Sequence, residues 1–147
     1  MADLALLREI ARADNFLAVL SVTRPDGTVH ASVVKAGILD DPRDGEPSVG
    51  VVVAGTARKL EHLRRSRYAT IVFKDEGRWA AAEGPARLEG PDDPAPPGPS
   101  RPPLALIRAI YVAAGGAHDN WEEFDRVMTE ERRCAVLIKP RRIWGNG

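Results

Sequence analysis

The sequence contains very little cysteine or histidine, and this scarcity excludes several kinds of protein. Cys134 is the only cysteine, so no disulfide can form within the chain, and we expect a reducing, cytoplasmic environment. The histidines, His30, His62 and His118, lie far apart, and no two of them have the spacing of metal ligands on one helix. The sequence therefore predicts neither a disulfide-stabilised secreted domain nor a metal site.

An excess of one charge and long apolar runs are also missing. The 21 basic and 21 acidic residues cancel, so no overall field attracts nucleic acid. The longest apolar stretches, such as 50–55, fall far below the roughly 20 residues that a membrane-spanning helix needs. Acids and arginines interrupt the apolar pattern of segment 1–14, which argues against a signal peptide. We expect one domain over 1–147, with neither a nucleic-acid nor a membrane partner.

Apolar stretches rich in β-branched residues predict a mainly β (α+β) chain. Turn sequences at 25–27 and 75–77 join neighbouring stretches into hairpins. About six antiparallel strands with helices between them fit a closed barrel better than a doubly wound parallel sheet. The predicted strands are 16–23, 28–39, 48–54, 69–74, 78–88 and 134–138, with 142–144 as an extension of the last.

Segments with helical periodicity lie between these strands. Asp3 is expected to cap the first helix and Asp119 the last, with Trp121 and Phe124 of the last helix in the core. The segment 90–103 holds seven prolines and is expected to be an irregular excursion within the single domain. The other predicted helices are 57–67 and 104–114.

The most informative segment joins a buried strand to a short basic helix. The strand stops at Gly55, and Thr56 and Ala57 lead into a helix that opens with Arg58 and Lys59. Free N–H groups and the macrodipole at a helix start favour an anion, whereas two cations there oppose the dipole unless an anion compensates them. The Thr56 hydroxyl, the first N–H groups and the two cations can converge on one phosphate. The alternative is that the cations are simply solvated.

The predicted strand 28–39 has a half-polar and an apolar face. His30, Ser32 and Val34 share one face by the period of two, and Val29 and Val33 lie on the other. The half-polar face suits either solvent or the edge of a cofactor. No nucleophile elbow surrounds Ser32, which argues against a hydrolase.

Together these segments resemble the split-barrel family of pyridoxamine-5'-phosphate-oxidase-like flavoproteins, and in particular its branch that uses the deazaflavin coenzyme F420. The resemblance spans nearly the whole chain, and the order of its motifs is more specific than any one of them. It implies a split β-barrel of the FMN-binding type and a homodimer with the cofactor at the subunit interface. The stretches that carry it are 30–37, 57–60, 82–86, 115–121 and 142–144.

The resemblance also implies roles for particular residues. Ser32, Val33, Val34 and Lys35 would line the ring of the cofactor. The phosphate would be held by the residues Thr56, Ala57, Arg58 and Lys59. Trp79 occupies the place of a residue that touches the cofactor from one subunit. Members of the branch often have Asn where this chain has Lys35.

The expected activity is hydride transfer from reduced F420 to an unsaturated or conjugated small molecule. The alternatives are an FMN-binding flavin reductase or oxidase of the same fold, and a non-catalytic protein that carries the cofactor. We expect Arg64, Arg65 and Arg67 to be a solvated helix face or to contact an anionic cofactor tail. His118 with Asp119 is expected to be a turn and a cap rather than a general-acid pair, and Glu83 a hydrogen-bonding residue at a strand end.

Overall fold

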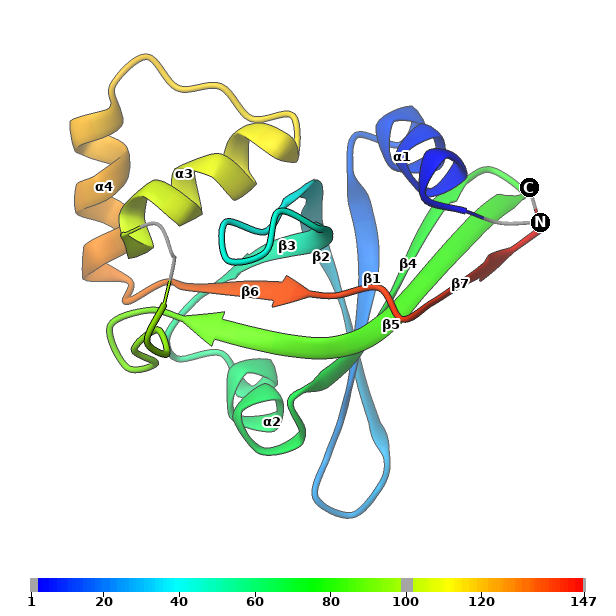
Figure 1. Ribbon diagram of the computed structural model, residues 1–147, viewed down its shortest axis with the longest axis horizontal. Coiled ribbons are helices and arrows are strands. Elements are labelled where there is room, and N and C mark those ends of the chain that lie inside the picture. Colours follow the sequence, from blue (N-terminus) through cyan, green and yellow to red (C-terminus); the bar gives the residue numbers. More distant parts are fainter. Residues whose placement is uncertain (1–2, 99–101, 147) are drawn as a thin grey trace.

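A computed structural model describes residues 3–98 and 102–146. The described chain forms a closed antiparallel barrel with helices around it (Figure 1). Its elements, in order, are α1 (Leu4–Ala13), β1 (Leu17–Thr23), β2 (Val29–Asp40), β3 (Pro47–Val53), α2 (Arg58–Ser66), β4 (Tyr68–Asp75), β5 (Arg78–Glu89), α3 (Pro103–Ala113), α4 (Trp121–Glu130), β6 (Cys134–Ile138) and β7 (Arg142–Gly145).

The barrel closes in the order β4-β1-β2-β3-β6-β5, with β5 pairing back onto β4. This confirms the predicted barrel of antiparallel strands. The predicted extension of the last strand is instead a separate strand, because β7 leaves β6 and pairs with β5, where Ala81 lies opposite Trp144. Pro140, between the two strands, has no N–H to continue a ladder.

Two long strands, β2 and β5, each change partners along their length. The first half of β2 pairs with β1, from Val29 to Lys35, and the second half pairs with β3, starting where Ala36 lies opposite Val51. Likewise, β5 pairs first with β4 and then with β6. Each long strand therefore belongs to both halves of the barrel.

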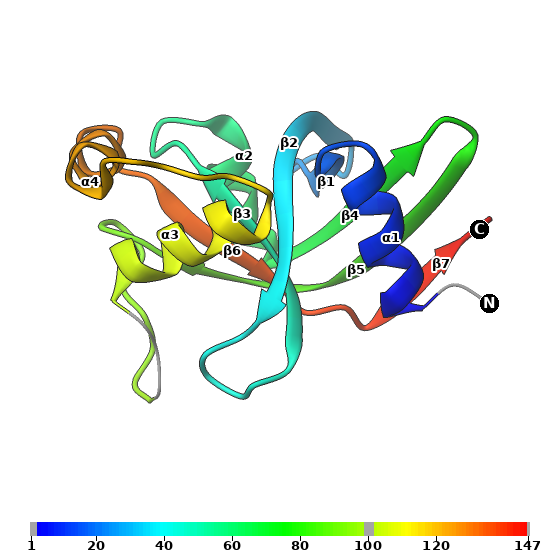
Figure 2. The ribbon, with the colours of Figure 1, turned by 90° about the horizontal axis from the view of Figure 1, so that it is seen from above.

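The helices occupy separate sides of the barrel. Figures 1 and 2 show α3 and α4 together on one side and α1 on the opposite side, with α2 beside the projecting β1–β2 hairpin in Figure 1. The barrel interior is one hydrophobic cluster, which includes the fully buried Leu20, Ile71 and Phe73. A second cluster, around Leu106 and Ile110, packs α3 and α4 against β6.

Local signals account for most of the element ends. Asp3 caps α1 as predicted, its carboxylate accepting a hydrogen bond from the Leu6 N–H at 3.0 Å. The cap of α4 is Asn120 and not Asp119, because the Asn120 side chain accepts from the Glu123 N–H at 3.1 Å. Pro103 begins α3, one residue earlier than predicted, since proline suits the first helical turn. The rest of the proline-rich excursion that is described is irregular apart from a bridge between Gly90 and Asp93, and residues 99–101 lie outside the described part.

Candidate functional site

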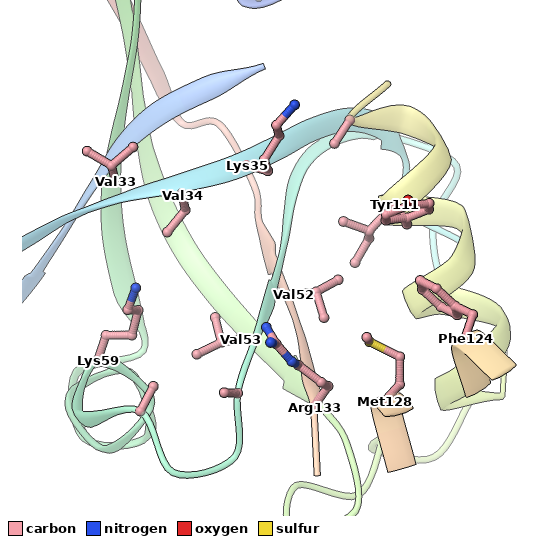
Figure 3. Close-up of a pocket in the computed structure, with 14 residues that line it drawn as sticks. Val33, Val34, Lys35, Val52, Val53, Lys59, Tyr111, Phe124, Met128 and Arg133 are labelled. Carbon is pink, nitrogen blue, oxygen red and sulfur yellow. The ribbon is translucent and has the colours of Figure 1, made fainter. Parts of the chain in front are cut away.

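A cavity of about 430 Å³ lies where β2 changes partner, between the start of α2 and the α3–α4 pair. This volume lies within the range of about 300–1,000 Å³ that is usual for small-molecule sites. Figure 3 shows the site with its labelled side chains. The cavity is lined by Val33, Val34, Lys35, Val52, Val53, Ala54, Ala57, Lys59, Ile110, Tyr111, Ala114, Phe124, Met128 and Arg133.

The β2 strand presents an open backbone edge to this cavity. Val34 and Lys35 pair with β1 on one side, opposite Ala18 and Leu17. On the other side, strand pairing between β2 and β3 begins only at Ala36, so within the described residues no strand pairs with that edge of 33–35. Backbone N–H and C=O groups on an open edge require another hydrogen-bonding partner. This edge can therefore receive the polar rim of a planar ring.

The simplest expectation for a half-polar strand is that its polar face meets solvent, and β2 has the opposite orientation. Its apolar face is the exposed one, since Val29 and Val33 are 58% and 68% exposed. Its half-polar face is turned inward, and His30 and Ser32 are half-buried there. Both His30 Nδ1 and Ser32 Oγ are buried without any hydrogen-bond partner. Buried polar atoms without partners are rare, so these two atoms are available to a bound ligand or water.

The charged lining of the cavity comes from cations. Figure 3 shows the side chains of Val33 and Lys35 pointing away from the cavity and that of Val34 pointing into it, while Lys59, which lines the cavity, extends from α2 towards β2. Burial, and secondarily the charge of Arg133, lowers the pKa of Lys59. Among the described residues that line the cavity there is no Asp or Glu. The site is therefore apolar with a cationic end.

The sequence-predicted residues are divided between the cavity and its surroundings. Five of the predicted residues line it: Val33, Val34, Lys35, Ala57 and Lys59. Ser32 lies on the same strand with its free hydroxyl facing inward. Thr56 and Arg58 are exposed at the start of α2 and do not line the cavity, and the residue that caps α2 is Ala57.

Trp79 lies elsewhere in the protomer, at the start of β5 on the β4–β5 hairpin. The backbone N–H of Trp79 donates to Asn146 Oδ1 at 2.7 Å, and the residue is 36% exposed. It is not among the residues that line the cavity. Within one chain the structure does not bring Trp79 to the ring-binding strand, so its predicted role requires a second subunit.

Arg64, Arg65 and Glu83 each contact another residue of the chain. Arg64 is held by Asp93, with two guanidinium nitrogens at 2.8–3.1 Å from the carboxylate, so it is not a freely solvated side chain. Arg65 donates to the carbonyl of Thr23. Glu83 lies in the middle of β5 and not at a strand end, facing Arg142 at 3.4 Å.

His118 and Cys134 have the contacts of structural residues. His118 lies in the loop before α4, where its Nδ1 accepts from the Asn120 N–H at 3.0 Å and lies 3.9 Å from Asp119 Oδ1, and its ring packs beside Tyr111, Trp121 and Phe124. Cys134 is buried as predicted, and burial raises the pKa of its thiol to about 12.

Within the described ranges, no group of three His, Cys, Asp or Glu residues is placed to hold a metal ion, and no helix has the length and hydropathy that crossing a membrane requires.

The far wall of the cavity consists of residues that the sequence did not indicate as part of a site. Tyr111, Phe124, Met128 and Arg133 come from α3, α4 and the turn that follows α4. The aromatic and Met residues look like ordinary core positions in the sequence, and Arg133 stands in a charged run with no motif around it. Only the folded arrangement brings them to the start of α2.

The fold has known counterparts among solved structures. An FMN-binding protein from Nostoc punctiforme, related to pyridoxamine 5'-phosphate oxidase, superposes with a TM-score of 0.64 at 12% identity, over 99% of this chain and 84% of that one. The chain has the split-barrel fold of the pyridoxamine-5'-phosphate-oxidase-like proteins. An F420 reductase shares this split barrel, with a TM-score of 0.60 at 12% identity over 88% of this chain and 90% of that one.

A heme-binding protein from Mycobacterium smegmatis has the same split barrel. Its TM-score is 0.63 at 17% identity, over 100% of this chain and 55% of that longer one. No protein-family model matches the sequence. At these identities the likeness establishes the fold.

Proposed function

We propose that the protein is an oxidoreductase that binds the deazaflavin coenzyme F420 in the cavity beside β2 and uses it to reduce an unsaturated or conjugated small molecule. The observation that carries the proposal is the open edge of β2 beside an apolar cavity with a cationic end. A flavin or deazaflavin has the matching parts, namely a planar ring with a hydrogen-bonding rim and a phosphate on its side chain. When bound, the coenzyme supplies the hydride.

The protein's own residues bind and orient in this scheme. The open edge of β2 near Val34 would hold the rim of the ring, and Lys59 would bind the phosphate. Val52, Val53 and Met128 form apolar walls that exclude water. The described residues that line the cavity include no carboxylic acid and no histidine, so the proton is expected to come from solvent or from the substrate.

The proposed enzyme is a homodimer whose second subunit completes the site. The outward face of the β1–β2 hairpin carries exposed apolar residues, with Val33 opposite Val19, which is 37% exposed, and Leu17 nearby at 38%. Val33 and Lys35 belong to this face and also border the cavity. A second copy that covers the face would therefore close one side of the cavity and could bring its Trp79 to the ring.

FMN is the alternative cofactor within the same fold, since it carries both a ring with a similar rim and a phosphate, and the Nostoc punctiforme structure is described as FMN-binding. Binding without turnover is the alternative function, and the neighbour described as heme-binding makes haem a ligand to include in the test. We propose that the protein is located in the reducing cytoplasm, which suits its single, buried thiol.

Titration of the purified protein with F420, FMN and haem, followed by tryptophan fluorescence and absorbance, tests the proposal. We expect F420 to bind most tightly and its reduced form to be oxidised when a panel of conjugated enones is added. If FMN binds in preference and supports turnover, the cofactor assignment is wrong. If F420 binds but no acceptor oxidises its reduced form, the carrier function replaces the enzyme.

A further inference from the structure

The turn between α4 and β6 packs directly onto the loop between β3 and α2. The Gly55 N–H donates to the carbonyl of Glu131 at 3.0 Å. A Cβ added at Gly55 would lie only 2.6 Å from the carbonyl oxygen of Arg132, so only glycine permits this approach. Arg132 itself has a positive φ of 49° and turns its side chain outward to Asp92. The contact therefore fixes the backbone position of the next residue, Arg133.

Arg133 enters the same cavity as Lys59. Both residues line it, and Figure 3 shows the guanidinium of Arg133 directed into the space that Lys59 faces. The two cations are close enough for the charge of Arg133 to contribute to the lowered pKa of Lys59. Within the described chain, no acidic residue forms an ion pair with Lys59. Arg133 is paired with Glu131 but Lys59 has no such partner among the described residues, so an anion between the two cations would reduce their mutual repulsion.

Arg58 does not have this geometry. It is exposed, does not line the cavity, and stands on the outer side of the start of α2. A pair of adjacent cations at a helix start is thus divided, with one side chain in the cavity and one in solvent. The second cation of the cavity comes instead from the turn after α4.

We propose that Arg133 and Lys59 together form the anion-binding site of the cavity, and that Glu131 is its internal competitor. The ligand is a phosphate group, because the planar guanidinium offers a bidentate fork and the ammonium a second point of contact. Only the identity of the molecule that carries this phosphate rests on the proposed function.

Glu131 supplies the competition. Its carboxylate lies 2.8 Å from Arg133 Nε, and the side chain is 45% exposed. A phosphate that binds Arg133 must share or replace this contact. An exposed ion pair is weak, so a phosphate that also contacts Lys59 displaces it at modest cost. Removing the Glu131 charge should therefore strengthen anion binding, which a purely structural Arg133 would not show.

The test uses the full chain, with inorganic phosphate, FMN, F420 and riboflavin as probes, because riboflavin has the ring without the phosphate. Arg133→Gln should weaken the binding of inorganic phosphate and of whichever phosphorylated cofactor binds by about tenfold or more, and should leave riboflavin unchanged. Arg132→Gln is the matched control, since it removes a neighbouring cation that faces outward, and it should change neither. Glu131→Gln should tighten phosphate binding a few fold, and Arg133→Lys should retain part of the affinity.

NMR titration of Lys59 gives a reading that needs no ligand. Arg133→Gln should raise the pKa of Lys59 part of the way toward its ordinary value, since burial remains, and Arg132→Gln should not. Wild-type phosphate affinity in Arg133→Gln, or a larger loss in Arg58→Gln, would overturn the inference while leaving the proposed function intact. Arg133-dependent binding of inorganic phosphate without binding of F420 or FMN would keep the inference and reject the proposed function.

Discussion

The close approach at Gly55 predicts that a single methyl group will loosen the site. In Gly55→Ala the new Cβ would lie 2.6 Å from the Arg132 carbonyl oxygen and 2.8 Å from the Arg132 Cβ, both closer than real contacts allow. The neighbours are backbone and near-backbone atoms, which cannot rotate away, so the turn after α4 must move. Overpacking of this kind costs about 1–3 kcal/mol, and weakening the Gly55–Glu131 hydrogen bond adds about 0.5–1.5 kcal/mol.

We therefore expect Gly55→Ala to lose about 2–4 kcal/mol of unfolding free energy. For a domain of this size the melting temperature should fall by about 5–15 °C, which calorimetry would detect. Because the same movement withdraws Arg133, the affinity for phosphorylated cofactor should fall more than the affinity for riboflavin.

Gly77→Ala is the matched control. A Cβ at Gly77 meets no heavy atom within 4 Å, so that variant should be neutral or slightly more stable. A Gly55→Ala protein that melts with the wild type and binds phosphate with full affinity would refute the account of the docked turn.

Three further changes test the ring-binding strand, the dimer and the buried charges. Val34→Trp should block the cavity, so hydride transfer falls sharply while inorganic phosphate binds as before; a fully active variant contradicts the placement of the ring. Light scattering of the wild type should give about twice the 16.0 kDa chain mass, and Val33→Glu should give a monomer. Asp41 is 2% exposed and accepts hydrogen bonds from Arg87 at 2.6 and 2.8 Å. Burial by itself would raise the pKa of Asp41, but the hydrogen bonds from Arg87 and from the Arg43 N–H outweigh burial, so the net pKa is lowered. Its stabilisation is thus present above the ordinary value of 3.8 and lost as the pH falls through the lowered folded value. Asp41→Asn should cost about 3 kcal/mol near neutral pH, and denaturant titrations should find little difference from the wild type in strong acid.

Local patterns were sufficient to predict the strands and most helix ends. The Pro25-Asp26-Gly27 turn forms as expected, with Asp26 Oδ1 accepting from the Thr28 N–H at 3.0 Å and Gly27 at a φ of 87°. Such signals act over a few residues, so they can be recognised without the fold. Where two good caps are adjacent, as at Asp119 and Asn120, the local signal does not decide between them.

The orientation of β2 and the far wall of the cavity could not be predicted in this way. A period of two separates His30 and Ser32 from Val29 and Val33 but does not say which set faces inward. In the folded barrel, His30 and Ser32 face inward, and Val29 and Val33 are exposed. Arg133 lines the same cavity as Lys59 because two loops that are distant in the sequence contact each other, which no spacing rule describes.

The ladder between β3 and β6 has a consequence for how the protein is made. Val49 pairs with Ile138 and Val53 with Cys134, so the barrel stays open until β6 has left the ribosome. Pairings between such distant segments form slowly, since a long loop must close before any contact repays it. Until then β3 exposes an unpaired, Val-rich edge, a template for aggregation. Because Arg133 directly precedes β6, phosphate binding during synthesis should begin only as the barrel closes, and a phosphorylated ligand would then favour the closed form over its aggregation-prone precursor.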